Sequence, residues 1–291
     1  MKKDISGDRF AIQFWGVRGS IPSPGPTTLR YGGNTSCIEM RIGGKRLIFD
    51  GGTGLRLLGK SLSPSLEEEI YMFFTHYHWD HIQGLPFFFP SFDEESRFII
   101  HGQVPDEGEP MKMARHFRDR VLHLNSPIPI AQIRAQMKFH DLVCGELFTL
   151  DDIAIETAPL NHPNGAMGYR ISWGGHTAVY CTDTEQFPDR LDENVLHLAR
   201  DADILIYDAM YTDEEYHNPK TPKVGWGHST WQEGVRVCQA AGVKRLVVFH
   251  HDPNHSDDFL DNVAIEVEAA LPGSVLAKEG MILHLDRLND E

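Results

Sequence analysis

One short segment restricts the possible folds of this chain more than any other feature. Residues 75–81 read Thr-His-Tyr-His-Trp-Asp-His and directly follow the apolar run Tyr71–Phe74. Three imidazoles and one carboxylate within six residues are a metal-site composition, because these ligands suit zinc, iron or manganese. Core packing or a solvated face does not explain four such residues together. The segment therefore predicts a strand that ends in a metal-binding loop, with partners supplied by other parts of the chain.

The remaining pattern is mixed α/β. Two Gly-Gly pairs predict β-hairpins over Ile38–Asp50 and Tyr169–Cys181. Further strands are predicted at Phe10–Trp15, Ile70–Phe74, Phe98–His101, Ile153–Ala158, Ile204–Tyr207 and Arg245–Phe249. Helices are predicted at Pro110–Leu122, Leu191–Ala199, Trp231–Ala241 and Asp257–Ala270, the third with Thr230 and Glu233 in capping-box spacing. The absence of a linker-like segment favours a single domain, residues 1–291.

Charge and cysteine content restrict the partners and the compartment. The formal net charge of −15 opposes binding of a long nucleic acid, which requires many lysine and arginine contacts to phosphate. The four cysteines are scattered and form no C-x-x-C pair, as expected of reduced thiols. The polar N-terminus resembles no secretory signal, and the apolar runs are too short to span a bilayer. We therefore expect a cytoplasmic protein with a small anionic partner and no membrane contact.

Three later segments each carry ligand-type residues after a predicted strand. They are Asn161-His162-Pro163, Thr182-Asp183-Thr184 and Phe249-His250-His251. Together with the H-x-H-x-D-H segment, and in this order, they resemble the metal-binding motifs of the metallo-β-lactamase superfamily. The resemblance covers nearly the whole chain. It implies an α/β fold, a four-layer αβ/βα sandwich with two mixed β-sheets, with the metals at one edge between the sheets.

The same resemblance implies a dinuclear centre. Its two divalent ions are expected to be zinc, with manganese and iron left open. Glutamate often replaces His78 in the di-iron redox branch, so the motif favours hydrolysis. The adjacent His251 remains an alternative to His250, and Asp50 is expected to support the metal loop without direct ligation. The implied ligands are His76, His78 and His162 for the first ion, Asp80, His81 and His250 for the second, and Asp183 as a bridge.

A further segment, Gly225–Thr230, bears on the reaction. It resembles the H-S-T element of the phosphodiesterase branch, which includes ribonuclease Z-like enzymes. This implies that His228 donates a proton to the leaving oxygen or stabilises charge on the phosphoryl oxygens, and that Asp208 orients it. Independently of this segment, the carboxylate of Asp80 is expected to orient the attacking hydroxide as well as to bind metal. The alternatives are an exposed, idle histidine beside a helix N-cap and an aspartate that caps a helix. The loop Gly16–Pro22 also resembles this branch; it is a candidate lining of the substrate cleft, and the alternative, more common for such glycine-rich loops, is a plain connector.

These features predict a dinuclear metal-dependent hydrolase. The favoured reaction is cleavage of a small cyclic nucleotide or cyclic phosphate ester by a hydroxide that bridges the metals. A ribonuclease Z-like RNA processing endonuclease is the second hypothesis, although the acidic charge opposes it. A lactone or carboxylic ester hydrolase would not need His228, and a non-enzymatic metal-binding module is the remaining alternative. The sequence leaves open whether the chain forms a homodimer.

Overall fold

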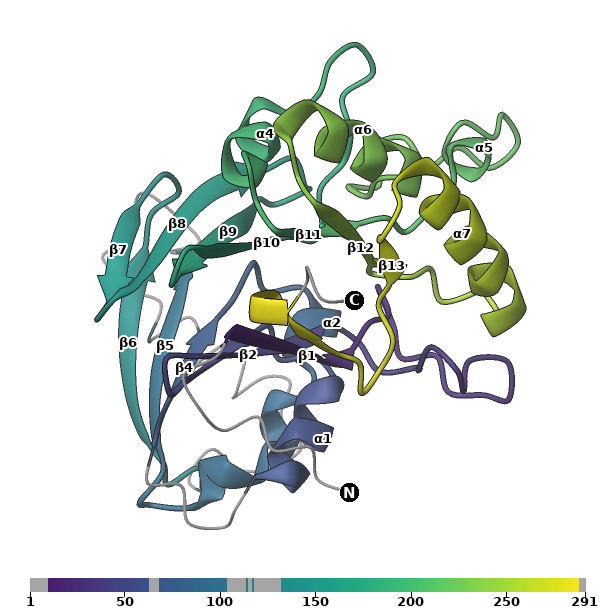
Figure 1. Cartoon of the computed structure of the whole chain (residues 1–291). Helices are drawn as coiled ribbons and strands as arrows, with labels where there is room; N and C mark the ends of the chain where they lie inside the picture. Colours follow the sequence, from purple (N-terminus) through teal and green to yellow (C-terminus); the bar gives the residue numbers. More distant parts are fainter. Residues whose placement is uncertain (1–9, 63–67, 104–113, 115–116, 118–131, 288–291) are drawn as a thin grey trace.

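Two seven-stranded mixed sheets dominate the computed structural model, which describes residues 10–62, 68–103, 114, 117 and 132–287 (Figure 1). The first sheet has the order β14-β1-β2-β3-β4-β5-β6. Its strands are β1 (Phe10–Gly16), β2 (Cys37–Ile42), β3 (Lys45–Phe49), β4 (Glu69–Phe73), β5 (Arg97–Gln103), β6 (Gln136–Leu142) and β14 (Ile282–His284). The pairs from β3 to β6 are parallel, whereas the pairs β14–β1, β1–β2 and β2–β3 are antiparallel.

The second sheet repeats this plan, with antiparallel pairs from β7 to β10 and parallel pairs from β10 to β13. Its strands are β7 (Leu147–Leu150), β8 (Ile153–Leu160), β9 (Ala166–Trp173), β10 (His176–Cys181), β11 (Ile204–Asp208), β12 (Arg245–Phe249) and β13 (Val275–Leu276). The helices are α1 (Gly54–Ser61), α2 (Trp79–Ile82), α4 (Glu193–Ala199), α5 (Asp213–Tyr216), α6 (Trp231–Ala241) and α7 (Asp257–Ala270). Short 3₁₀ helices lie at Leu85–Phe87, Phe89–Phe92 and Leu285–Arg287.

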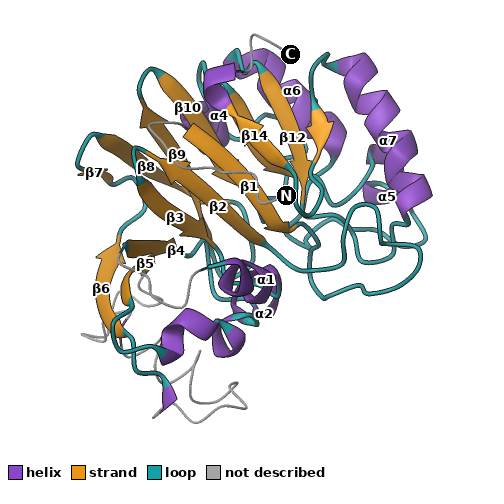
Figure 2. Ribbon diagram, turned by 60° about the horizontal axis from the view of Figure 1, so that its bottom comes forward, coloured by secondary structure: helices purple, strands orange, loops and turns teal. Residues whose placement is uncertain are grey.

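The apolar faces of the sheets and helices determine how the layers stack. Aromatic side chains of both sheets meet in the central core, where Phe49 stacks on Phe73 at 5.1 Å and contacts Tyr169 edge-on at 5.4 Å. Helices α4, α6 and α7 cover the outer face of the second sheet, and α1 covers the first (Figures 1 and 2). The resulting order is helix, sheet, sheet, helix. This confirms the predicted four-layer α/β fold.

Most predicted elements are present. Both Gly-Gly hairpins are confirmed, and in the first Gly43 and Gly44 have φ of 54° and 77°, as a type I′ turn requires. Helices α6 and α7 have the predicted bounds. The predicted helix at residues 110–122 lies outside the described residues, apart from positions 114 and 117. No described helix has the length and apolar character that a membrane span needs.

One local prediction is confirmed only in part. Thr230 caps α6 by accepting a hydrogen bond from the Glu233 amide at 3.1 Å, but the reciprocal half of the capping box is absent. The Glu233 carboxylate instead accepts from Arg236 Nε at 2.7 Å, because a guanidinium one turn further along offers a charged donor. A complete capping box occurs in α5, between Thr212 and Glu215.

Candidate metal centre

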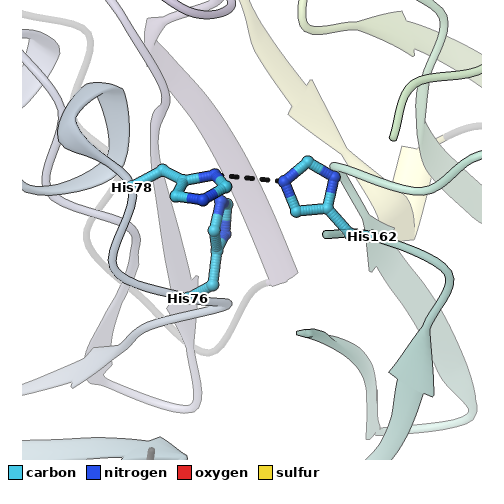
Figure 3. Close-up of side chains that lie close together, drawn as sticks. All are labelled: His76, His78 and His162. Atoms are coloured by element: carbon cyan, nitrogen blue, oxygen red, sulfur yellow. Dashed lines mark hydrogen bonds between the residues drawn. The ribbon is translucent and has the colours of Figure 1, made fainter. Parts of the chain in front are cut away.

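The seven predicted ligands lie together at one edge of the two sheets. His76 and His78 occupy the loop after β4, and α2 begins there and carries Asp80 and His81. The other three follow strand ends of the second sheet: His162 after β8, Asp183 after β10 and His250 after β12. Because these ends meet at the same edge, residues far apart in sequence converge. Figure 3 shows His162 facing the His76–His78 loop from the opposite sheet.

The first group consists of His76, His78 and His162. One ligand nitrogen of each lies within 4.8 Å of the others. His78 Nδ1 is 3.1 Å from His162 Nε2, the pair joined by the dashed line in Figure 3. The ring of His76 lies 4.5 Å from that of His78 and 4.9 Å from that of His162. Three imidazole nitrogens therefore point at one common volume.

The second group consists of Asp80, His81, Asp183 and His250, all buried. Asp80 Oδ2 lies 3.3 Å from His81 Nε2 and 3.2 Å from His250 Nε2. Asp183 Oδ2 lies 3.1 Å from His81 Nε2 and 3.3 Å from His250 Nε2. Two imidazoles and two carboxylates thus surround a second volume.

The Asp183 carboxylate lies between the two groups. Whereas its Oδ2 faces His81 and His250, its Oδ1 lies 3.7 Å from His76 Nε2 and 3.8 Å from His162 Nε2. Each oxygen therefore faces a different group. This is the arrangement by which one carboxylate can serve two cations.

The chemistry of these donors fits a pair of cations. His76 Nε2 and His81 Nε2 are buried without a hydrogen bond, and an unsatisfied buried polar atom is costly. Burial, reinforced by His81, holds the pKa of His76 well below its ordinary value. Burial acts to raise the pKa of Asp80 and Asp183, but His81 and His250 outweigh it and keep both carboxyls ionised. The buried His/Asp clusters fit a dinuclear metal site.

Supporting contacts fix the ring orientations. Asp50 Oδ2 accepts hydrogen bonds from His81 Nδ1 and from the Tyr180 hydroxyl, both at 2.9 Å, while Thr75 donates its amide to Oδ1 at 2.9 Å. His81 therefore turns Nε2 toward the site. His162 Nδ1 donates to the Gly227 carbonyl at 2.8 Å, with the same result.

The Asp50 contact leads to the first prediction. We expect Asp50→Ala to weaken zinc binding by about 10- to 100-fold, because His81 loses the partner that sets its tautomer and orientation. Zinc titration of the folded variant measures this. An unchanged affinity would show that His81 is oriented without Asp50.

Three residues at the site have left-handed backbone conformations. Asp50, Asp183 and His250 have φ of 59°, 55° and 63°, and each lies within two residues of a strand end. This conformation is uncommon for residues other than glycine, and such strain concentrates at functional sites. Two of these residues, Asp183 and His250, contact ligand-type residues of the other sheet, His81 and Asp80.

The loop Gly16–Pro22 lies against the metal centre. The Ser20 amide donates to Asp80 Oδ2 at 2.8 Å. A Cβ added at Gly19 would come within 2.5 Å of His250 Nδ1, so only glycine leaves room for this imidazole. The sequence left open whether this loop lines a cleft or is a plain connector, and it did not predict these two contacts, which depend on a distant strand end.

Adjacent histidines have different environments. His250 belongs to the second group, whereas His251 Nε2 lies 2.9 Å from the Ala277 carbonyl oxygen and its ring meets Tyr31 edge-on at 5.7 Å. The geometry therefore places His250, which the resemblance favoured, in the second group and His251 outside it.

His228 and Asp208 form a buried pair beside both groups. His228 Nδ1 donates to Asp208 Oδ2 at 2.7 Å, and its ring lies 5.0 Å from that of His250 and 5.3 Å from that of His162. Burial acts to lower the pKa of His228, but Asp208 and Asp183 outweigh it and raise it to about 9. His228 is only 8% exposed, so it is not a surface histidine beside a helix N-cap.

Glu185 is a site residue that sequence analysis missed. Its Oε1 accepts hydrogen bonds from the Tyr216 hydroxyl and the Gly225 amide, both at 2.6 Å, and its Oε2 accepts from the Gly227 amide at 2.8 Å. Its own amide donates to the Asn161 carbonyl at 2.8 Å. Glu185 thus joins the loop of His162 to the loop of His228. A cavity of about 760 Å³ borders both loops and is of small-ligand size.

The fold and the His/Asp site define a metal-dependent hydrolase of the metallo-β-lactamase superfamily, to which this chain belongs. Residues 45–251 match the family described as the beta-lactamase superfamily domain. Ribonuclease Z of Acaryochloris marina is 26% identical, with 91% of this chain and 94% of the relative covered. The distant homologues therefore lie in the branch that the sequence resembles.

Solved structures support the same fold. The metallo-beta-lactamase fold protein YhfI from Bacillus subtilis has a TM-score of 0.71 and 20% identity, covering 96% of this chain and 100% of that one. A diphosphatase from the PhnP family has a TM-score of 0.65 and 21% identity, covering 95% and 97%.

Proposed function

We propose that this hydrolase cleaves the phosphodiester bond of a small cyclic nucleotide or cyclic phosphate ester. In the proposal His76, His78 and His162 bind one divalent ion, Asp80, His81 and His250 bind the other, and Asp183 serves both. Bound there, the ions would lower the proton affinity of water and polarise the phosphoryl oxygens. Zinc is the expected metal, with manganese and iron as alternatives.

The observation that carries the proposal is the His228–Asp208 pair beside both ligand groups. A departing alkoxide needs a proton, and a buried imidazole with a raised pKa holds one at neutral pH. Asp208 accepts from Nδ1 and so directs Nε2 away from itself. Asp80, next to His250, is the carboxylate that we expect to orient the attacking water. An ester or lactone hydrolase would give His228 no such role.

The acidic net charge of the chain favours a small substrate. The net charge of −15 opposes binding of a long polyanion, so the hypothesis of ribonuclease Z-like RNA processing, which the names of distant relatives suggest, ranks second.

The domain organisation and the compartment are also part of the proposal. The two sheets share one central core, which supports a single domain over residues 1–291. Cytoplasmic location fits cysteines that are all free, three of them buried.

The proposal is tested with a substrate panel. Purified protein loaded with zinc or manganese is assayed on bis-p-nitrophenyl phosphate, cyclic mononucleotides, precursor transfer RNA and a simple lactone. Turnover of the cyclic mononucleotides supports the proposal. Turnover of transfer RNA alone, or of the lactone alone, would replace it with the corresponding alternative.

A second prediction concerns the proton donor. We expect His228→Ala to lower diester kcat about 100-fold, within the range for loss of a general acid, while the bound metal content stays unchanged. His197→Ala is the matched control, because His197 pairs with Glu156 on the surface and is expected to keep full activity. Equal turnover of the His228 variant and the wild type would show that His228 is not the proton donor. If Asp80→Ala is inactive in the same assay, the metal-dependent mechanism would still stand.

A further inference from the structure

A surface-exposed tryptophan lies beside the metal centre. Trp226 belongs to the segment Lys223–Gly227, called the recognition arm below, and its side chain is 56% exposed. The next residue, Gly227, accepts the hydrogen bond from His162 Nδ1, and His228 follows. Two peptide units span at most about 7 Å, so the Trp226 backbone lies that close to the His228 backbone.

The ammonium group of Lys223 lies close to both Trp226 and the surroundings of His228. Lys223 Nζ is 4.1 Å from the centroid of the Trp226 ring and 5.2 Å from that of Tyr211. The Tyr211 ring in turn meets His228 edge-on at 6.3 Å. Within the described part of the chain, Lys223 forms no ion pair, so no carboxylate neutralises the positive charge that it holds against the two rings. The arm therefore combines an indole and an ammonium group near the proposed proton donor.

Hydrogen bonds brace the backbone of the recognition arm. Glu185 accepts hydrogen bonds from the amides of Gly225 and Gly227, whose φ values of 87° and 84° favour glycine. The Trp226 amide donates to the Lys223 carbonyl at 3.0 Å and closes the turn. A preorganised surface loses little conformational entropy on binding, which favours recognition of a ligand.

We propose that the recognition arm binds the nucleobase of a nucleoside phosphodiester, with Trp226 stacking on the base and Lys223 attracting the phosphate. This inference rests on the proposed function and adds the substrate class that the site selects. A planar base covers an exposed indole that water solvates poorly, and every base has a π-face for such stacking. Lys223 stabilises the indole through a cation–π contact while it adds positive potential in an acidic protein.

The test compares two substrates that differ only in the base. For a nucleoside 3′,5′-cyclic monophosphate, we expect Trp226→Ala to raise KM about tenfold or more with kcat little changed. For ribose 3′,5′-cyclic phosphate without a base, KM stays the same. Trp226→Phe restores most of the affinity because it keeps a stacking ring. Lys223→Ala raises KM for both substrates.

The control is Ile265→Ala on α7, another large exposed apolar side chain, which is expected to leave both KM values unchanged. Equal effects of Trp226→Ala on both substrates would overturn the inference, whereas the proposed function would stand. If the wild type cleaves neither substrate, the proposed function fails. In that case, quenching of indole fluorescence by the cyclic nucleotide tests base binding without turnover. Quenching that is lost in Trp226→Phe supports binding of the base by the recognition arm. No quenching in the wild type would overturn the inference.

Discussion

Replacing Asp183 with asparagine is expected to lower phosphodiester kcat/KM by about a thousandfold or more. The two carboxylate oxygens face different ligand groups, at 3.1 Å from His81 Nε2 on one side and 3.7 Å from His76 Nε2 on the other. Asparagine keeps the shape but loses the charge and one oxygen acceptor. A thousandfold loss corresponds to about 4 kcal/mol of transition-state stabilisation, the scale of a disrupted metal centre.

Two measurements check this expectation. Steady-state kinetics gives the loss in kcat/KM, and elemental analysis gives metal content, which is expected to fall by at least one ion per chain. Asp192→Asn is the matched control, because Asp192 is a buried aspartate that caps α4 and asparagine caps a helix equally well. An Asp183→Asn protein with two ions and normal turnover would show that Asp183 is not the bridge.

The clustering of the seven candidate ligands was predictable because much of their signal is local. His76 to His81 lie on one continuous segment, and His162, Asp183 and His250 each follow an apolar run that reads as a strand. The resemblance favoured His250 over His251, but both follow β12, so only the three-dimensional environment separates the two imidazoles. The resemblance to a known superfamily supplied the pairing of distant segments.

Other features had no local signal. Strand β6 alternates exposed and half-buried residues at a sheet edge, so its pattern in Gln136–Leu142 lacks the apolar run that marks a core strand. Strands β13 and β14 span only two and three residues. Glu185 acts through Gly225 and Gly227, 40 and 42 residues away, and a carboxylate alone does not reveal such partners.

Metal removal is expected to abolish hydrolysis and also to destabilise the fold. Unfolding separates ligands from β4, β8, β10 and β12, so the ions bind the folded chain far better than the unfolded one. At free metal about a thousandfold above Kd, one such ion stabilises by about 4 kcal/mol, or about 5–10 °C in melting temperature for a chain of this size.

Thermal melting followed by circular dichroism, with and without chelator, measures this difference. Addition of zinc or of manganese in separate samples is expected to restore both activity and melting temperature, and the metal that restores more identifies the better fit. The Asp183→Asn variant is expected to show a smaller chelator effect, whereas His228→Ala is expected to show the full one, because His228 acts on the substrate and not on the ions. The contrary result is a wild-type protein that has lost its metal to the chelator and yet melts at an unchanged temperature. It would mean that the fold does not depend on the ions for its stability.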